Sequence, residues 1–289
     1  MTTLPDKGKI LITGGNSMLA LYLSRVMGER AILFDKNALD IRNTESFKAL
    51  LESEKWAAVI NTAGVYSAER KDLFDIHAFC SAQIALCCFN KNIPFVFVST
   101  ARVFDGKKKE GAYVESDQPN PLDDYGLSKY LGEHFIQNDG IEKPYYIFRL
   151  PMLLGERLSG KERQIVYRLI DLAANNKTVK VAGDVYHSPV STMYAAQMIS
   201  QTLGSRMPSG IYHITGNDHA SLHDIVQRTF SLLDIKSSIN KVSHDYFDGK
   251  TIFPRNMILS SEKLPAGPGW EVVVEQFVSE IRNRQRTRS

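Results

Sequence analysis

The chain has 289 residues, of which 43% are hydrophobic and 23% charged, as in an ordinary soluble globular protein. Lys and Arg total 35 against 32 for Asp and Glu, and this net charge of +3 is too mild to indicate binding to nucleic acid or a membrane. The N-terminus has no signal-peptide pattern, and no apolar run approaches the length of a membrane span. The three cysteines, Cys80, Cys87 and Cys88, lack metal-ligand spacing. We therefore expect reduced core cysteines, no metal site and a cytoplasmic location.

Short apolar runs alternate with helical patterns through the first half of the chain. Strand-like runs are expected at residues 9–13, 31–34, 57–61, 95–99 and 145–150. Helices are expected at 18–27, 44–53 with Thr44 as the N-cap, 78–90 and 121–137. This alternation predicts an α/β fold with a doubly wound, Rossmann-type parallel sheet.

In such sheets ligands bind beyond the carboxyl ends of the strands. The residues at or near those ends are Gly14, Asp35, Asn61, Thr100 and Arg149. We expect them to lie along one edge of the sheet, although they are far apart in sequence.

A glycine-containing turn, residues 13–20, joins the first expected strand to the first helix. Backbone amides and the positive end of the helix dipole can hold a pyrophosphate there. Gly14 permits a tight turn, and Asn16, Met18 and Leu19 complete the expected phosphate site. Ser17 stands where a third glycine is expected, so its side chain either binds phosphate or crowds the site. An ordinary glycine-rich turn, in a fold whose cofactor site has decayed, is the alternative.

Asp35 closes the second strand. A carboxylate there can accept hydrogen bonds from the adenosine ribose of NAD. The neighbouring Lys36 could instead contact the 2′-phosphate of NADP. The sequence leaves NADH and NADPH both open.

A tyrosine and a lysine stand four residues apart in Tyr125-Gly-Leu-Ser-Lys129. On a helix they share one face, and the ammonium is expected to lower the phenol pKa from about 10. Such a phenol can exchange a proton with a substrate oxygen, and beside a nicotinamide it supports reversible carbonyl reduction. The spacing alone also fits a solvated helix face. The hydroxyl-bearing strand end at Ser99 and Thr100 strengthens the catalytic interpretation.

After about residue 155 the pattern changes. Helical patterns cover 165–174, 193–203 and 221–233, and strand-like runs cover 179–182 and 210–215. We expect residues 1–155 to form the dinucleotide-binding domain and 156–289 mainly a smaller α/β substrate-binding lobe. The two are expected to interlock, with an approximate boundary and a cleft between them.

Several motifs resemble the extended short-chain dehydrogenase/reductase family, most closely its dTDP-4-dehydrorhamnose reductase group. Residues 99–106, Ser-Thr-Ala-Arg-Val-Phe-Asp-Gly, resemble the group's Ser-Thr-Asp-Tyr-Val-Phe-Asp-Gly. Residues 125–133 match its Tyr-Gly-x-Ser-Lys-x-x-Gly-Glu, and residues 254–264 are similar to its Pro-x-Asn-Ser-x-Leu…Lys-Leu. The resemblance spans essentially the whole chain.

The resemblance implies an enzyme that uses NADPH or NADH to reduce the C4 keto group of a nucleotide-linked 4-keto-6-deoxy sugar. It implies that Tyr125 donates the proton, that Thr100 polarises the carbonyl, and that Lys129 holds the nicotinamide ribose and tunes Tyr125. Further cofactor contacts are expected from Asp40, Ile41, Thr62, Ala63 and Gly64. Substrate contacts are expected from Tyr66, Ala101, Arg102, Met152, Ser188 and Asn256. The expected partner is the nucleotide sugar, without nucleic acid or membrane, and a homodimer is compatible with this interpretation.

The chain departs from the group at positions that contact the sugar in its members. Ala101-Arg102 replaces Asp-Tyr, Met152 replaces an aromatic residue, and His187-Ser188-Pro189-Val190 replaces Gly-Ser-Pro-Thr. The sugar therefore need not be the rhamnose precursor. Arg102 could pair with a carboxylate or a phosphate, or lie in solvent.

Two other functions remain open. One is a cofactor-binding regulatory subunit without chemistry, as in the resembling regulatory subunit of methionine adenosyltransferase, because fold does not dictate function. The other is an epimerase or dehydratase, although Ala101 stands where related dehydratases carry an acid after the threonine.

Overall fold

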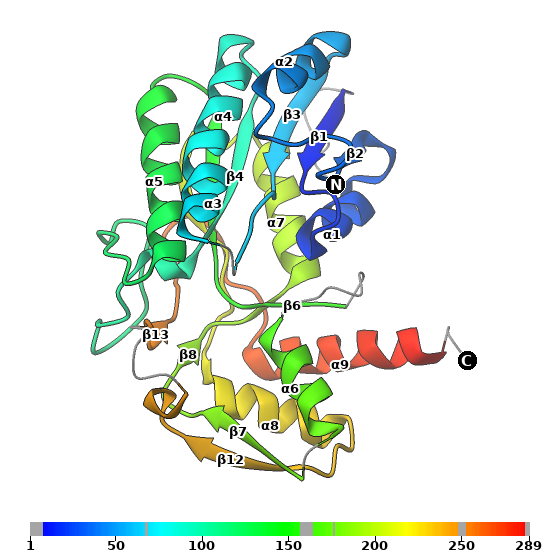
Figure 1. The fold of residues 1–289 in the computed structure, drawn as a ribbon, viewed down its shortest axis with the longest axis vertical. Helices are drawn as coiled ribbons and strands as arrows, with labels where there is room; N and C mark the ends of the chain where they lie inside the picture. Colours follow the sequence, from blue (N-terminus) through cyan, green and yellow to red (C-terminus); the bar gives the residue numbers. More distant parts are fainter. Residues whose placement is uncertain (1–7, 67–68, 157–163, 176, 248–252, 287–289) are drawn as a thin grey trace.

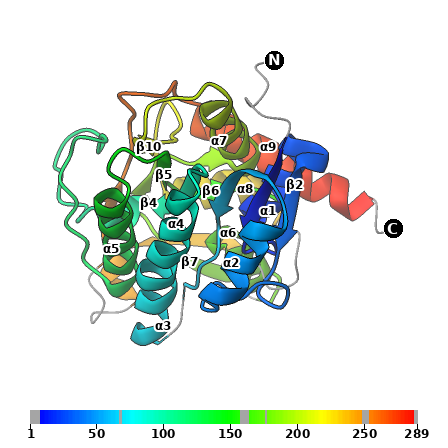
Figure 2. The same cartoon turned by 90° about the horizontal axis from the view of Figure 1, so that it is seen from above.

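The computed structural model describes residues 8–66, 69–156, 164–175, 177–247 and 253–286. A large sheet with helices on both faces forms one layered unit, and a smaller α/β lobe lies against the end of that unit (Figure 1). The view from above shows the helices on the two sides of the sheet (Figure 2).

The large sheet has six strands. In spatial order they are β10 (Gly210–His213), β5 (Tyr145–Leu150), β4 (Phe95–Thr100), β3 (Trp56–Asn61), β1 (Lys9–Thr13) and β2 (Ala31–Phe34). Every neighbouring pair is parallel. The predicted α/β, Rossmann-type fold is confirmed, and strand order reverses between β1 and β3, the kind of position where such folds bind nucleotides.

Helices cover both faces of this sheet. One face carries α1 (Met18–Met27) and α7 (Thr192–Gly204), and the other carries α2 (Thr44–Ser53), α3 (Arg70–Phe74), α4 (Ser81–Asn90) and α5 (Asp124–Asp139). The N-cap of α2 is Asn43, whose side chain accepts from the Ser46 amide, so the prediction of Thr44 as N-cap is wrong by one residue.

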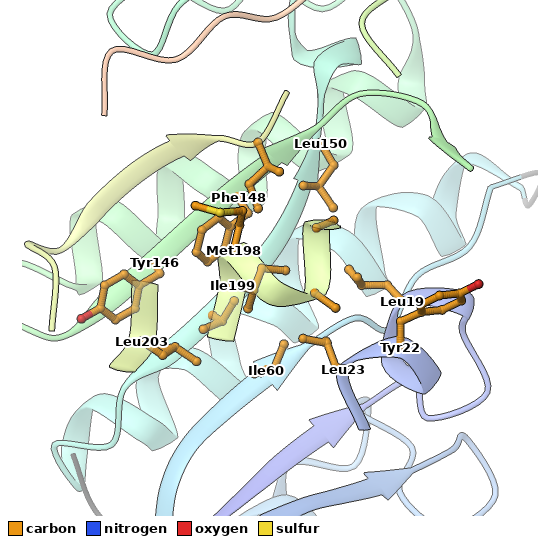
Figure 3. Packing of buried hydrophobic residues seen from close by; sticks show 14 of the residues in the cluster. Leu19, Tyr22, Leu23, Ile60, Tyr146, Phe148, Leu150, Met198, Ile199 and Leu203 are labelled. Carbon is orange, nitrogen blue, oxygen red and sulfur yellow. The ribbon is translucent and has the colours of Figure 1, made fainter. Parts of the chain in front are cut away.

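Strand residues alternate between the two cores because successive side chains point to opposite faces. Ile10 packs in the core beneath α1 and α7, whereas its neighbour Leu11 packs in the core beneath α2 and α4. Figure 3 shows the first of these cores, where Leu19 and Leu23 of α1 approach Ile199 of α7. Burying such a side chain contributes about 1.5–3 kcal/mol. A strand buried on both faces therefore appears in the sequence as a continuous apolar run.

One helical segment, Arg70–Asn90, is long and apolar enough to cross a membrane. It consists of α3, a π-helical stretch (Asp75–Cys80) and α4. The prediction that no run approaches this length is therefore wrong by length and composition. Half of the segment is buried within the protein, where it packs on α5 and on the sheet, which is the behaviour of a core helix.

The smaller lobe contains short sheets and three helices among the described residues. Its helices are α6 (Ile165–Ala173), α8 (Leu222–Leu232) and α9 (Trp270–Arg286). Its strands are β6 (Leu153–Leu154) paired with β9 (Val190–Ser191), β7 (Thr178–Ala182) paired with β12 (Ser238–Val242), and β8 (Tyr186–His187) between β11 (Ala220–Ser221) and β13 (Asn256–Met257). β10 and α7 come after residue 155 yet belong to the large unit, while the domain boundary near residue 155 stays a prediction.

A buried ion pair fastens α5 to the sheet. The Arg149 guanidinium donates to the Glu133 carboxylate with an Nη2–Oε2 distance of 2.7 Å, and the two side chains are 2% and 0% exposed. The Ser99 hydroxyl also donates to Glu133. Arg149, expected at the ligand edge, therefore lies in the core, paired with a glutamate that follows Lys129 by one helical turn.

We predict that Glu133→Ala lowers the free energy of unfolding by about 3–5 kcal/mol, because it leaves the Arg149 charge buried and unpaired. Equilibrium urea unfolding measures this change. Lys48→Ala is the matched control, since Lys48 pairs with Glu45 on the exposed surface of α2 and its removal is expected to cost less than about 1 kcal/mol. Equal losses in the two variants would show that the buried pair has no special role.

Candidate active site

The predicted catalytic residues meet where β4 ends and α5 begins. Thr100 is the last residue of β4, and Tyr125 lies in the first turn of α5. Asp123 is the N-cap of α5, and its Oδ1 accepts from the Gly126 amide at 2.8 Å. Gly126 packs so close to the Arg102 carbonyl oxygen that an added Cβ would lie 2.2 Å away. The fold therefore fixes the start of this helix directly against the residues after Thr100.

The Thr100 and Tyr125 hydroxyls form a hydrogen bond that favours the phenolate and thus lowers the pKa of Tyr125. The Thr100 Oγ1 also accepts from the Arg102 amide at 3.3 Å. A hydroxyl that accepts one hydrogen bond can still donate its own proton, and donation from Thr100 to the phenol oxygen accounts for the lowering. Two hydroxyls converge on one point, as needed to bind a single carbonyl oxygen.

Burial dominates the titration of Tyr125 and raises its pKa to about 12. The positive charge that opposes this rise most is Arg102. The expectation of a lowered tyrosine pKa is therefore wrong in this structure, because loss of hydration outweighs the effect of the positive charge of Arg102.

Lys129 lies one turn after Tyr125, and burial lowers its pKa to about 7. Its Nζ donates to the Val98 carbonyl oxygen at 2.9 Å and lies 4.8 Å from the centre of the Phe97 ring. A Cβ added to Gly64 would lie 3.7 Å from this Nζ, so the ammonium adjoins the predicted cofactor-binding residue Gly64.

His77 belongs to the same site, although it was not among the residues expected there. Its Nε2 accepts from the Val65 amide at 3.0 Å, and its Nδ1 lies 2.9 Å from the Ser128 hydroxyl. Its ring meets the Tyr125 ring edge-on at 5.4 Å. Burial, assisted by Lys129, lowers the His77 pKa to about 2, so it is a neutral support for the loop before α3. No spacing in the sequence links His77 to α5.

The β1–α1 turn has the backbone shape of a phosphate site. Gly14 has φ = 67°, and a Cβ there would lie 2.7 Å from the backbone of Ala63. Met18 and Leu19 occupy the first turn of α1, where amides have no intrahelical acceptor. Those amides and the helix dipole fit a pyrophosphate, so the residues present are compatible with a bound dinucleotide.

Ser17 is engaged with the protein itself. Its hydroxyl caps α1 by accepting from the Ala20 amide at 3.1 Å, and it lies 2.8 Å from the Thr62 hydroxyl. Thr62 donates in turn to the Thr13 carbonyl at 2.7 Å. The Ser17 side chain is thus held by α1 and the end of β3, and it takes one amide of the turn.

Asp35 organises the turn after β2. Its carboxylate accepts from the Asn16 amide group at 2.9 Å and from the backbone amides of Asn37 and Ala38. These bonds, led by the one from Ala38, lower the Asp35 pKa and keep it charged. Lys36 is exposed beside it.

The two other residues expected near the adenosine have different surroundings. The Asp40 carboxylate binds the Arg42 guanidinium, with an Nε–Oδ1 distance of 3.0 Å. Ile41 is buried in the core beneath α2 and α4. Only its backbone is therefore suited to the predicted cofactor contact.

Tyr66 and Arg102 lie against Tyr125. The Tyr66 ring, 51% exposed, lies 5.0 Å from the Tyr125 ring, and Arg102 donates to the Tyr66 hydroxyl. Arg102 pairs with Asp123 at 2.6 Å between Nη2 and Oδ2. Of the alternatives left open for Arg102, the structure shows pairing with a carboxylate. Asp123 was not predicted, although an acid just before the helix start is an N-cap signal.

The remaining predicted substrate residues support the backbone. Ala101 is buried beside Phe104, and the Ser188 hydroxyl accepts from the Leu259 amide at 3.0 Å. The Asn256 side chain donates to the carbonyl oxygens of residues 108 and 111. Met152 is partly buried against the core of the smaller lobe.

A cavity of about 560 Å³ lies beside Asn256, between the 106–112 loop and residues 216–219. Asn256 is the only predicted site residue that lines it. Over the part of the chain that the structure describes, no group of three or more His, Cys, Asp or Glu is placed to hold a metal ion.

Residues 8–283 match the model of the RmlD substrate binding domain. The chain is 26% identical over 261 residues to a dTDP-4-keto-6-deoxy-D-glucose reductase of Streptomyces niveus, covering 87% of this chain and 88% of that protein. It is 26% identical over 242 residues to methionine adenosyltransferase 2 subunit beta of Xenopus tropicalis, covering 78% of this chain and 69% of that protein.

The solved dTDP-4-dehydrorhamnose reductase of Bacillus anthracis in complex with NADP superposes with a TM-score of 0.87 at 25% identity, covering 95% of this chain and all of that one. The family model and this solved structure each match nearly the whole chain, and not the nucleotide-binding sheet alone. The chain belongs to the RmlD substrate-binding domain family of extended short-chain dehydrogenases/reductases.

Proposed function

We propose that the protein is an NAD(P)H-dependent reductase of the C4 keto group of a nucleotide-linked 4-keto-6-deoxy sugar. The observation that carries the proposal is the convergence of Thr100 and Tyr125, with Lys129 one turn away beside Gly64. The names of the relatives support this substrate class, since the Streptomyces niveus protein is a dTDP-4-keto-6-deoxy-D-glucose reductase.

In this proposal Thr100 and Tyr125 bind the substrate carbonyl oxygen through their hydroxyl groups. Tyr125 then delivers its proton to that oxygen as the carbonyl is reduced. Bound nicotinamide would supply the hydride. Lys129 would hold the nicotinamide ribose hydroxyls through its ammonium, which already adjoins Gly64. Burial of the phenol keeps it protonated and therefore ready as an acid.

The cofactor would lie along the carboxyl ends of β1, β2 and β3. The amides of Met18 and Leu19 would hold the pyrophosphate, and Gly14 and Gly64 leave room for close approach. Asp35 favours NADH, because its charged carboxylate suits ribose hydroxyls and repels a 2′-phosphate.

On the substrate side, Tyr66, Arg102 and Met152 remain the proposed contacts with the sugar. Ala101, Ser188 and Asn256 would act only through the backbone they support. A cytoplasmic location and a homodimer also remain proposals.

A non-catalytic regulatory subunit is the second candidate, favoured by the similarity to methionine adenosyltransferase 2 subunit beta. The hydrogen-bonded Thr100 and Tyr125 argue against it, since a scaffold needs no such pair. An epimerase or dehydratase is disfavoured, because the residue after Thr100 is the buried Ala101 and supplies no acid. Lack of turnover with every keto-sugar nucleotide, together with a stable complex with a larger enzyme, would support the regulatory role.

Tyr125→Phe is expected to lower turnover of a dTDP-linked 4-keto-6-deoxyhexose by about 10²–10⁴-fold, because it removes the proton donor. NADH and NADPH oxidation measures turnover, and nucleotide fluorescence should show cofactor affinity within about threefold of the unmodified protein. Tyr130→Phe, on the same helix, is the matched control and should retain turnover. Normal activity in Tyr125→Phe would remove this residue from the proposed mechanism.

Asp35→Asn should change the cofactor preference. The variant keeps an oxygen acceptor for the amides of Asn37 and Ala38 but loses the charge. We expect the affinity for NADPH relative to NADH to rise about tenfold or more, measured by fluorescence titration. Asp139→Asn removes a charge at the exposed end of α5 and should leave the ratio unchanged. An unchanged ratio in Asp35→Asn would contradict the proposed role in cofactor choice.

Lys129 should make stability depend on pH. Its pKa falls from 10.5 to about 7 on folding, so between these values the unfolded chain binds the extra proton and stability rises with pH. Lys129→Met should abolish turnover, because it removes the proposed contact with the nicotinamide ribose. It should also raise the free energy of unfolding by on the order of 3 kcal/mol at pH 8, because methionine has no charge to lose on burial. Urea unfolding from pH 7 to 10.5 should show this advantage shrinking. Lys36→Met, at an exposed lysine, is the control and should show no such pH-dependent gain in stability. A Lys129→Met protein that is destabilised equally at every pH would contradict the argument.

A further inference from the structure

Arg102 is the clearest departure of this chain from the motif that its residues 99–106 resemble, and it lies on the catalytic tyrosine. Its Nε and Nη2 donate to Asp123 Oδ2 at 3.1 and 2.6 Å. The two side chains are only 12% and 11% exposed, so this ion pair is shielded from water. A pair in such surroundings interacts more strongly than one on the open surface.

Three aromatic rings surround the guanidinium. Its Cζ lies 5.2 Å from the centre of the Tyr66 ring, 5.1 Å from that of Tyr125 and 4.7 Å from that of Phe253. These distances are within the range of cation–π attraction, and arginine stacks well on aromatic faces. The arginine is therefore held in one place by rings as well as by a carboxylate.

Arg102 contacts three parts of the site: the end of β4, the start of α5 and the Tyr125 ring. Its backbone amide donates to Thr100 Oγ1 at 3.3 Å. Its side chain binds Asp123, whose other oxygen caps α5 through the Gly126 amide at 2.8 Å. Its guanidinium contacts the ring of Tyr125 itself. One residue thus spans the threonine, the helix start and the phenol.

The charged and titratable groups around the phenol come from several elements. Asp123 and Tyr66 act against the phenolate and raise the Tyr125 pKa, and Arg102 lowers it more than either raises it. The His77 pKa of about 2 leaves that ring neutral. His187 on β8 is also neutral near pH 7, since burial and Arg102 lower its pKa to about 4. The Lys129 Nζ is turned to the Val98 carbonyl.

We propose that Arg102 is a positioning residue for the reaction: it holds Tyr125 against Thr100 and supplies the positive charge beside the phenol. Its catalytic consequence rests on the proposed reductase function. The contacts among Arg102, Asp123 and the Tyr125 ring are independent of that function. Removing the charge would leave a phenol that gives up its proton less readily, in a less fixed position.

The test follows the ionisation of residue 125 directly. All 12 tyrosines are replaced biosynthetically by a fluorinated tyrosine, whose more acidic phenol titrates in an accessible pH range. Fluorine NMR then follows each phenol, and the signal of residue 125 is the one missing from Tyr125→Phe. In Arg102→Gln the midpoint for residue 125 should rise by about one pH unit or more. A midpoint within about 0.3 pH units of the unmodified protein, a limit set well below the effect of a neighbouring charge, would overturn the proposal.

Further variants separate the effect of the lost Arg102 charge from the effect of a disturbed fold. Arg102→Lys keeps the charge and should give a midpoint closer to that of the unmodified protein than Arg102→Gln does. The double variant Arg102→Gln/Asp123→Asn leaves no buried charge unpaired, so it tests the proposal if Arg102→Gln does not fold. Its midpoint should lie above that of the unmodified protein and below that of Arg102→Gln. Arg255→Gln, which breaks ion pairs with Asp184 and Asp245 on the surface, should leave the titration midpoint of residue 125 unchanged.

Turnover gives the second readout. Arg102→Gln should lower kcat on a nucleotide-linked 4-keto sugar about tenfold with little change in the cofactor KM, and Arg102→Lys should restore part of the loss. Absence of turnover in the unmodified protein would refute the proposed function while the NMR shift still tests Arg102. An unchanged midpoint with normal turnover would refute the role of Arg102 and leave the reductase intact.

Discussion

The packing of α5 against β4 and β5 is the constraint on which the rest of the site depends. Glu133 on α5 and Arg149 on β5 form an ion pair shielded from water, and Ser99 of β4 adds its hydroxyl. A charge left alone there would be costly, so helix and strands cannot slide past each other without breaking the pair. Tyr125 and Lys129 precede Glu133 by about two turns and one turn of the same helix. Their positions at the sheet edge follow from this attachment.

Burial also sets the chemistry of the two titrating side chains. It raises the pKa of Tyr125 to about 12 and lowers that of Lys129 to about 7. Both changes favour the neutral forms, as expected when charged groups lose water. The Thr100 hydrogen bond and the Arg102 charge act against this tendency at the phenol. For the proposed carbonyl reduction, a site that excludes water must therefore supply its own stabilisation of the phenolate.

The glycine turn shows how one substitution can be accommodated. A serine replaces the expected glycine at position 17, and its hydroxyl caps α1 and contacts Thr62. The cap stabilises the helix start and uses the Ala20 amide, while the preceding amides of the first turn stay available. Helix capping and the proposed phosphate binding would thus use different amides of one turn.

The sequence by itself determined the fold class and most of the strand and helix ranges, because strands buried on both faces must be apolar throughout, as in residues 95–99. It also placed Gly14 and Thr100 at strand ends and put Tyr125 and Lys129 on one face of a helix, since a tight turn and a four-residue helical spacing are local properties. Only the tertiary structure decided that Arg149 lies in the core, that His77 supports the site, and that Arg102 pairs with Asp123, 21 residues away. Burial and charge pairing depend on which distant elements pack together, and those same contacts decide whether a phenol or an ammonium carries its proton.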